Sequence, residues 1–237
     1  LKFFASLDMP IAELYGQSEV TGPTSVSTKT AMKLGKLGRP MPGVEVRIAD
    51  DGEILVKGGN VCLGYFKEKE ATAELLQNGW LHSGDVGVLD EDGYLQITGR
   101  KKEIIVTSGG KKTAPSNIEG LLKGIEPIGN AMVIGEAKNY LVAILAIDPE
   151  RVTAFAAKKG FPLEPKKLVE DAGFRAYVKG EIDSAVNPRL AQFETIKKFE
   201  LLPHDFTIEG GELTSTLKVR RKVVAEKYAG MIEKLYA

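Results

Sequence analysis

The sequence predicts an α+β chain in two parts, a β-rich first part followed by a part in which strands and helices alternate. Residues 44–48 and 53–57 are β-type runs on either side of Asp50-Asp51-Gly52, where glycine supplies the positive φ of a hairpin turn. A second pair of such runs, within residues 86–98, also flanks an aspartate-rich turn with glycine. After residue 100 the glycine-rich hairpins give way to helical periodicity.

The remaining elements follow in chain order. Residues 67–77 are typical of a short helix between the two hairpins. In the second part, prolines suit the first turn of a helix, and apolar residues recurring every three or four positions indicate a buried face. The expected strands are 103–107, 132–134, 141–147 and 198–202, and the expected helices begin at Pro115 and Pro149 and cover 165–186 and 219–235.

Composition excludes several classes of protein. The 237 residues are 43% hydrophobic and 27% charged, as in a folded globular protein. Because 32 basic residues balance 32 acidic ones, no nucleic-acid partner is expected. A single cysteine, Cys62, and two histidines exclude a disulfide framework and leave too few ligands for a structural zinc site. No apolar run approaches the roughly 20 residues of a membrane span.

Tyr15-Gly16-Gln17-Ser18-Glu19 is the first segment with chemical potential. An aromatic face can stack on a base, a hydroxyl can donate to a phosphate oxygen, and a carboxylate can bind Mg²⁺. These residue types suit a nucleotide site. Taken alone, the segment also fits a polar turn.

Trp80-Leu81-His82-Ser83-Gly84-Asp85 is the second. An aspartate after Ser-Gly can accept two hydrogen bonds from a ribose diol. The same residues also suit a turn that leads into a strand with a capping aspartate.

The third segment joins the basic run Gly99-Arg100-Lys101-Lys102-Glu103 to Ser108-Gly109-Gly110-Lys111-Lys112. Three consecutive basic residues near a glycine pair can meet phosphates. A solvated charge run in a linker is the other interpretation.

Lys218 lies in the Ser/Thr-rich segment 213–218, just before the terminal helix. A lysine there can neutralise charge that develops on a phosphate or a carboxylate. An exposed lysine at a helix N-terminus is the other interpretation, but the helix dipole disfavours it.

Taken together and in this order, the segments resemble the adenylate-forming acyl-CoA synthetases, the AMP-binding superfamily. Tyr15-Gly16-Gln17-Ser18-Glu19 resembles the Tyr-Gly-x-Thr-Glu motif, with serine for threonine. Residues 52–58 with Gly64-Tyr65 resemble the Gly-Glu-Leu…Gly-Tyr motif. Gly84-Asp85, Gly99-Arg100-Lys101-Lys102-Glu103 and Lys218 match later motifs.

Three further features are most similar to the long-chain fatty acyl-CoA synthetases within this family. Residues 3–8 and residues 104–111 look most like that subfamily. Leu217 also stands where many other members have the glycine that precedes the catalytic lysine.

The resemblance implies a fold and an activity. Residues 1–99 correspond to the β-rich end of the large adenylation domain, and residues 100–237 to the small mobile α/β C-terminal domain. In the family, a carboxylate attacks the α-phosphate of ATP to give acyl-AMP, and the thiol of CoA then takes the acyl group. ATP, Mg²⁺ and CoA are therefore the expected cofactors, with a fatty acid as substrate.

The resemblance also implies roles for the nucleotide-site residues. Tyr15 is expected to pack against adenine, Ser18 to contact a phosphate and Glu19 to bind Mg²⁺. The implied ATP- and AMP-binding residues are Tyr15, Gly16, Gln17, Ser18, Asp85 and Arg100.

The later motifs carry the remaining roles. Asp85 and Arg100 are expected to contact the ribose, and Lys218 to bridge the carboxylate and the α-phosphate as the catalytic residue. Lys102 occupies the hinge position, where many relatives carry aspartate. Ser108-Gly109-Gly110 is expected to line the CoA channel, since glycines let a thin ligand pass close to the backbone.

One departure affects the expected activity of the chain. The family's Ser/Thr/Gly-rich phosphate loop, which lies upstream of the Tyr-Gly motif, has no counterpart. We therefore expect a fragment that is inactive alone and whose partner is the missing N-terminal part of the same enzyme. Transfer to a carrier-protein thiol and a non-catalytic module that needs a partner chain stay open. We expect a cytoplasmic location and leave peripheral membrane contact open.

Overall fold

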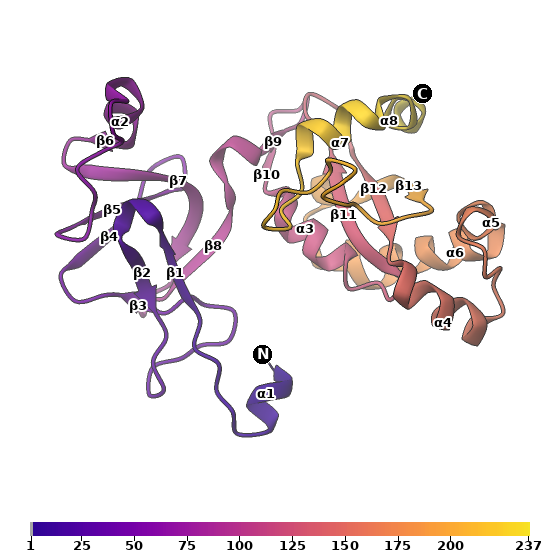
Figure 1. The fold of residues 1–237 in the computed structure, drawn as a ribbon, viewed down its shortest axis with the longest axis horizontal. Coiled ribbons are helices and arrows are strands. Elements are labelled where there is room, and N and C mark those ends of the chain that lie inside the picture. The colour runs from indigo at the N-terminus through magenta and orange to yellow at the C-terminus, as the bar shows by residue number, and fades with distance from the viewer. Residues whose placement is uncertain (1) are drawn as a thin grey trace. The chain divides into compact units, whose positions relative to one another are not determined.

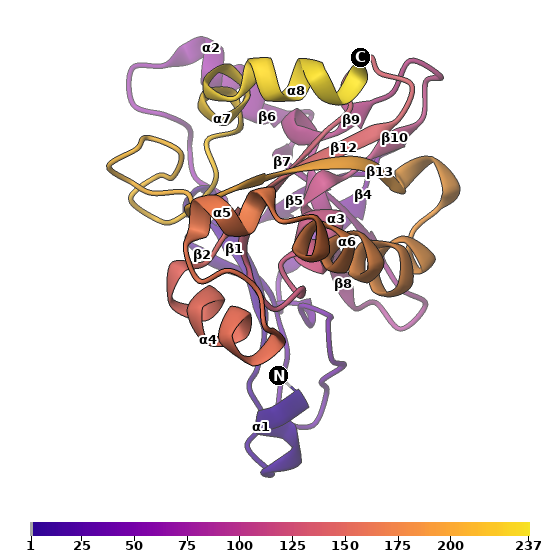
Figure 2. The same ribbon diagram turned by 90° about the vertical axis from the view of Figure 1, so that its right-hand side faces the viewer.

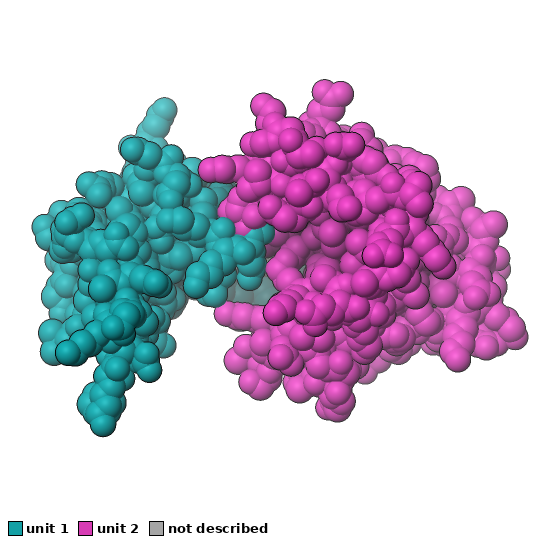
Figure 3. Space-filling model, turned by 90° about the horizontal axis from the view of Figure 1, so that it is seen from above, with its two compact units in different colours: residues 1–103 teal, residues 104–237 magenta. Residues whose placement is uncertain are grey.

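The computed structural model describes residues 2–237, and the chain divides into two units, residues 1–103 and residues 104–237. Figure 3 colours the two units separately. The division falls after Glu103, within a few residues of the composition change after Gly99. No helix in the described part of the chain combines the length and the apolar character needed to cross a bilayer.

Unit 1 is built mainly from antiparallel strands (Figure 1). One sheet has the order β1-β2-β3, and the other has the order β4-β5-β7-β6 with β8 paired to β7. The strands are β1 Leu14–Gln17, β2 Gly22–Val26, β3 Arg39–Pro40, β4 Val44–Ile48, β5 Glu53–Gly58, β6 Leu76–Gln77, β7 Trp80–Leu89 and β8 Leu95–Arg100. The helical segments are α1 Lys2–Ser6, η1 Ser18–Val20, α2 Lys69–Leu75 and η2 Lys101–Glu103.

Both predicted hairpins are confirmed. β4 pairs with β5 around the turn at Gly52, whose φ is +87°, and β7 pairs with β8. The helix predicted over 67–77 is shorter, because its last two residues form strand β6. These hairpins place residues 85 and 100 opposite each other on β7 and β8.

Unit 2 is a three-stranded sheet covered by helices on both faces. β12 pairs with β11 antiparallel and with β13 in parallel, and β9 and β10 form a separate hairpin. The strands are β9 Ile105–Val106, β10 Lys112–Thr113, β11 Ile128–Ile134, β12 Leu141–Ile147 and β13 Ile196–Leu202. The α-helices are α3 Pro115–Leu122, α4 Pro149–Lys159, α5 Pro165–Glu170, α6 Ala172–Glu181, α7 Arg221–Lys227 and α8 Ala229–Tyr236.

The central strand β12 explains this layering, because every residue in it is buried. Side chains alternate along a strand, so Val142, Ile144 and Ala146 join one core and their neighbours join the other. The first core includes α7 and α8, and the second includes α3, α4 and α6, which lie on opposite sides of the sheet in Figures 1 and 2. A continuous apolar run is typical of a strand covered on both faces.

Two helices predicted as continuous are broken, so those predictions are wrong. The stretch 165–186 ends its first helix at Asp171, whose carboxylate accepts the N–H of Phe174 at 2.8 Å and so begins α6. The terminal helix is interrupted at Tyr228 (φ −109°, ψ 21°). Periodicity records only which face is buried, and helical segments on either side of a break can share one apolar face.

Candidate nucleotide site and lysine loop

Tyr15, Asp85 and Arg100, which the sequence predicted as separate parts of one site, are in contact in unit 1. The Tyr15 hydroxyl donates to Oδ2 of Asp85 at 2.9 Å, and Nε of Arg100 lies 3.2 Å from Oδ1. Tyr15 is 6% exposed and Asp85 is 7% exposed, whereas the Arg100 side chain is 59% exposed. The carboxylate is thus held from two sides, and the cation that pairs with it is exposed at the surface.

Electrostatics keeps Tyr15 protonated. Burial raises the pKa of the Tyr15 hydroxyl well above its ordinary value, a hydrogen bond with Ser83 opposes this, and the neighbouring Asp85 carboxylate raises it further. A phenolate beside a carboxylate would place two negative charges together in a buried site. Tyr15 therefore acts as a hydrogen-bond donor at any physiological pH.

Gly16 is required by the backbone around Tyr15. The register of β1 against β2 shifts between Tyr15 and Gly16, and a Cβ on Gly16 would lie only 1.9 Å from the carbonyl oxygen of Gly22. The extra residue is Thr24 on β2, and the backbone of β2 lies so close that no side chain fits at position 16. Gly16 thus lets β1 approach β2 directly after Tyr15.

The residues of the first motif differ in their burial and in their contacts. The ring of Tyr15 belongs to the core with Val20 and Ile54, so its hydroxyl is the group directed at the site; its packing against adenine stays a prediction. Nε2 of Gln17 is buried without a hydrogen-bond partner among the described residues. Ser18 is exposed at the start of η1.

Glu19 connects the first two motifs. The Tyr65 hydroxyl donates to Oε1 of Glu19 at 2.7 Å, and the Cys62 N–H donates to the Glu19 carbonyl at 2.8 Å. The hydrogen bond to Glu19 raises the pKa of Tyr65 to about 12. Within residues 2–237, no group of three or more His, Cys, Asp or Glu side chains could hold a metal. A single carboxylate still suits Mg²⁺ when substrate phosphates complete its shell.

Glu53 is a residue to which the sequence analysis gave no role. It is 4% exposed, and its carboxylate accepts from the Gly84 N–H at 2.9 Å and from Nζ of Lys101 at 2.9 Å, with Nδ1 of His82 at 3.0 Å. Burial opposes its ionisation, but Lys101, His82 and the Gly84 N–H together lower the pKa of Glu53. Its place in the Gly-Glu motif was the available signal.

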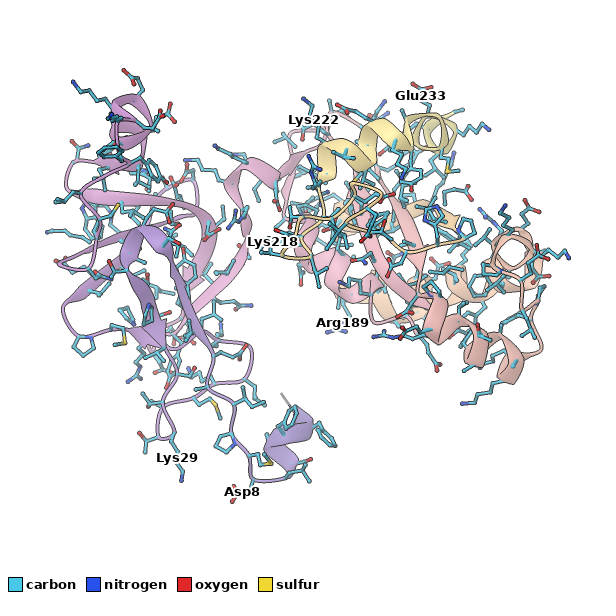
Figure 4. All side chains as sticks on the ribbon, in the orientation of Figure 1. Asp8, Lys29, Arg189, Lys218, Lys222 and Glu233 are labelled. Atoms are coloured by element: carbon cyan, nitrogen blue, oxygen red, sulfur yellow. The ribbon has the colours of Figure 1, made fainter. Side chains whose placement is uncertain are left out.

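The predicted catalytic lysine, Lys218, lies in unit 2 on a tight loop before α7, where Figure 4 labels it. The N–H of Thr214 donates to the Lys218 carbonyl at 2.9 Å, and the N–H of Lys218 donates to Oγ1 of Thr214 at 3.1 Å. A bridge between Leu213 and Val219 closes the loop. The Lys218 side chain is exposed, so it is available to a ligand.

Two ion pairs anchor the ends of this loop. Before it, Glu212 is 1% exposed and accepts from Lys227 at 2.6 Å and from the Tyr228 hydroxyl at 3.0 Å. After it, Arg221 donates to Oε1 of Glu119 at 2.6 Å. Burial opposes ionisation of Glu212, but Lys227, Tyr228 and backbone N–H groups lower its pKa to about 2.

The predicted CoA-channel residues form the turn between β9 and β10 in unit 2. The Gly110 N–H donates to the Thr107 carbonyl at 2.8 Å with φ at +73°, and Oγ of Ser108 donates to Asn139 at 2.6 Å. A Cβ on Gly109 or Gly110 would meet nothing within 4 Å, so this backbone is open. Lys102, the predicted hinge, is exposed on η2 in unit 1.

The class of protein that this fold and these motifs indicate is confirmed by comparison with known families. Residues 1–66 match the family described as AMP-binding enzyme, and residues 102–237 match the AMP-binding enzyme C-terminal domain. The second match alone spans more than half of the sequence. The chain belongs to the AMP-binding enzyme family.

Individual relatives agree with this assignment. The chain is 45% identical to the long-chain-fatty-acid–CoA ligase FadD15 of Mycobacterium bovis, over 99% of the chain and 39% of that protein. It is 26% identical to the O-succinylbenzoate coenzyme A synthetase (MenE) of Bacillus subtilis in complex with AMP, with a TM-score of 0.67 over 93% of the chain and 42% of that structure.

A third comparison concerns the fold alone. The adenylation domain of a carboxylate reductase from Mycobacterium chelonae has a TM-score of 0.76 at 21% identity, over 99% of the chain and 36% of that structure. The sequence predicted an α+β fold that corresponds to part of an adenylation enzyme, and this prediction is confirmed. The chain spans about two-fifths of the length of the curated relative, 39%.

Proposed function

We propose that the chain is the C-terminal part of an acyl-CoA synthetase that activates a long-chain fatty acid with ATP and transfers it to CoA. The Asp85 carboxylate, held between Tyr15 and Arg100, is the observation that carries the proposal. The name of the 45% identical relative, a long-chain-fatty-acid–CoA ligase, supports both the fatty acid and CoA.

Asp85 is suited to bind the ribose. An ionised carboxylate has about four lone-pair positions, and Tyr15 and Arg100 contact one oxygen each, so positions remain for both hydroxyls of a diol. Fixing the carboxylate in advance lowers the entropy cost of binding. The exposed Arg100 guanidinium adds a second contact with the sugar.

Glu19 is the residue that would hold Mg²⁺. Its Oε1 already accepts from Tyr65, which orients the carboxylate, and a carboxylate retains capacity for a cation. When bound with the triphosphate, Mg²⁺ would neutralise phosphate charge. Ser18, exposed one residue before, would donate to a phosphate oxygen.

Lys218 would act where negative charge accumulates. In adenylation, a fatty-acid carboxylate oxygen forms a bond to the α-phosphorus, and the bond to the β-phosphate breaks to release pyrophosphate. The ammonium group would bridge the two reacting anions. In the second step the CoA thiolate attacks the acyl carbonyl and AMP leaves, a step that needs no bridge of this kind.

Lys102 and the Ser108-Gly109-Gly110 turn would serve the second step. We infer that unit 2 turns about Lys102 between the two half-reactions, so that Lys218 leaves and the open glycine backbone borders the pantetheine arm. The exposure of Lys102 and the space around Gly109 and Gly110 are compatible with these roles.

The two half-reactions of the longer enzyme that contains this chain test the proposal. Lys218→Ala should lower fatty-acid-dependent ATP–pyrophosphate exchange by about 100-fold to 1,000-fold and change thioester formation from supplied acyl-AMP by less than about threefold. Lys222→Ala, an exposed lysine on α7, is the matched control and should leave both rates unchanged. Equal loss in both halves would count against the proposal.

A further inference from the structure

The Glu53 carboxylate contacts both flanks of the Asp85–Arg100 pair. Gly84 directly precedes Asp85, and Lys101 directly follows Arg100. Oε1 of Glu53 accepts the Gly84 N–H, and Oε2 accepts from Lys101, each at 2.9 Å. One buried side chain on β5 therefore joins β7 to the residue that directly follows β8.

Neither contact is independent of the other. A buried carboxylate is costly to ionise unless a cation pairs with it, and Lys101 is the cation that pairs with Glu53. The ionised form accepts a stronger hydrogen bond from the Gly84 N–H than a neutral acid would. Gly84 has φ of +72°, so this bond holds a left-handed turn immediately before Asp85.

The position of Lys101 is itself defined. Its ammonium group lies 2.7 Å from Asp51 as well as 2.9 Å from Glu53, and η2, which it begins, ends at the last residue of unit 1. His82, with Nδ1 at 3.0 Å from Glu53, completes the surroundings of the carboxylate. The segment that follows β8 is thus bound to the sheet through the ion pairs of Lys101, one residue before Lys102.

We propose that Glu53 is a positioning residue that couples the placement of Lys101, beside the hinge, to that of Asp85 in the nucleotide site. The coupling runs from Lys101 through Oε2 and Oε1 to the Gly84 N–H. It rests on the proposed function in one respect, because Asp85 must be a nucleotide ligand for the coupling to affect binding.

Amide hydrogen exchange in the 237-residue chain without nucleotide tests the coupling itself. Lys101→Ala should speed exchange of the Gly84 amide about tenfold, although Lys101 contacts the other carboxylate oxygen. Lys57→Ala removes a lysine from the same strand as Glu53, where it pairs with Glu45 at 3.5 Å, and should leave Gly84 unchanged. Unchanged exchange of the Gly84 amide in Lys101→Ala would overturn the proposal. This test keeps Glu53 in place, so it does not depend on whether a Glu53 variant folds.

AMP affinity of the longer enzyme tests the consequence. Glu53→Gln keeps an oxygen that can accept from Gly84 and should bind AMP more tightly than Glu53→Ala, while adding Lys101→Ala to Glu53→Gln should cause no further loss. Fully additive losses would refute the coupling. A wild-type enzyme that fails to bind AMP would refute the proposed function instead, and the exchange result would still decide the role of Glu53.

Discussion

The hydroxyl of Tyr15 lies 2.9 Å from Oδ2 of Asp85, across 70 residues of sequence. The contact joins the Tyr-Gly motif on β1 to the Gly-Asp motif on β7, and Arg100 on β8 completes it. Two segments that each fit an ordinary turn become one site when the strands pair. This contact is the structural basis of the nucleotide-binding proposal.

Removing the Tyr15 hydroxyl should destabilise unit 1. Tyr15→Phe leaves the buried Asp85 oxygen without its donor, so we expect the free energy of unfolding to fall by about 1–3 kcal/mol in urea titrations. Tyr65→Phe, which removes a hydroxyl bound to Glu19 at a 41% exposed residue, should cost less than about 1 kcal/mol. Equal losses in the two variants would contradict the buried role of Tyr15.

Glu212 should make stability fall at acid pH. Its pKa is lowered from 4.5 to about 2 in the folded chain, so its contribution is complete above pH 4.5 and is lost as pH falls from 4.5 towards 2. Glu212→Gln should therefore lower the free energy of unfolding by up to about 3 kcal/mol at pH 7 and by little near pH 2.

Unfolding curves of the wild-type chain and of Glu212→Gln between pH 2 and pH 7 provide the measurement. Glu164→Gln is the matched control, because Glu164 pairs with Lys167 on the surface, where solvent screens the pair. A difference between Glu212→Gln and wild type that stays constant over this pH range would show that the Glu212 charge is not the stabilising feature.

Leu217 should be a strained position in the loop that carries Lys218 and is closed by the bridge between Leu213 and Val219. It has φ of +59° and is 67% exposed, so its side chain gains little from packing. A left-handed residue with a Cβ costs about 1–2 kcal/mol, partly offset by the backbone entropy that glycine loses on folding. We expect Leu217→Gly to raise the free energy of unfolding by about 0.5–1 kcal/mol, and Leu217→Val to lower it. A destabilised glycine variant would contradict this assignment.

The parts of the fold that local patterns predict are those where the pattern and the burial coincide. The turn at Gly52 and the apolar run Leu141–Ile147 each specify their element within a few residues. The breaks at Asp171 and Tyr228 were missed because hydrophobic periodicity carries no sign of the capping bond from Asp171 or of the non-helical backbone angles of Tyr228.

The candidate site divides in the same way. Motif order indicated Tyr15, Asp85 and Arg100, which the strands bring together. The contacts of the Glu53 carboxylate were missed because its partners Gly84 and Lys101 lie 31 and 48 residues away in the sequence. Only strand pairing brings them within reach. Glu53 stands in the Gly-Glu motif, but its spacing in the sequence does not show that its carboxylate contacts Gly84 and Lys101.

Calorimetric titration of AMP into the longer enzyme of which we propose that this chain is a part tests the central claim most directly. Asp85→Asn keeps the size of the side chain but removes its charge and an acceptor, so we expect AMP affinity to fall by about tenfold to 100-fold. Asp92→Asn, an exposed aspartate in the turn between β7 and β8, should leave AMP affinity at the wild-type value. Equal AMP affinity in wild type and Asp85→Asn would contradict the nucleotide site proposed for this chain.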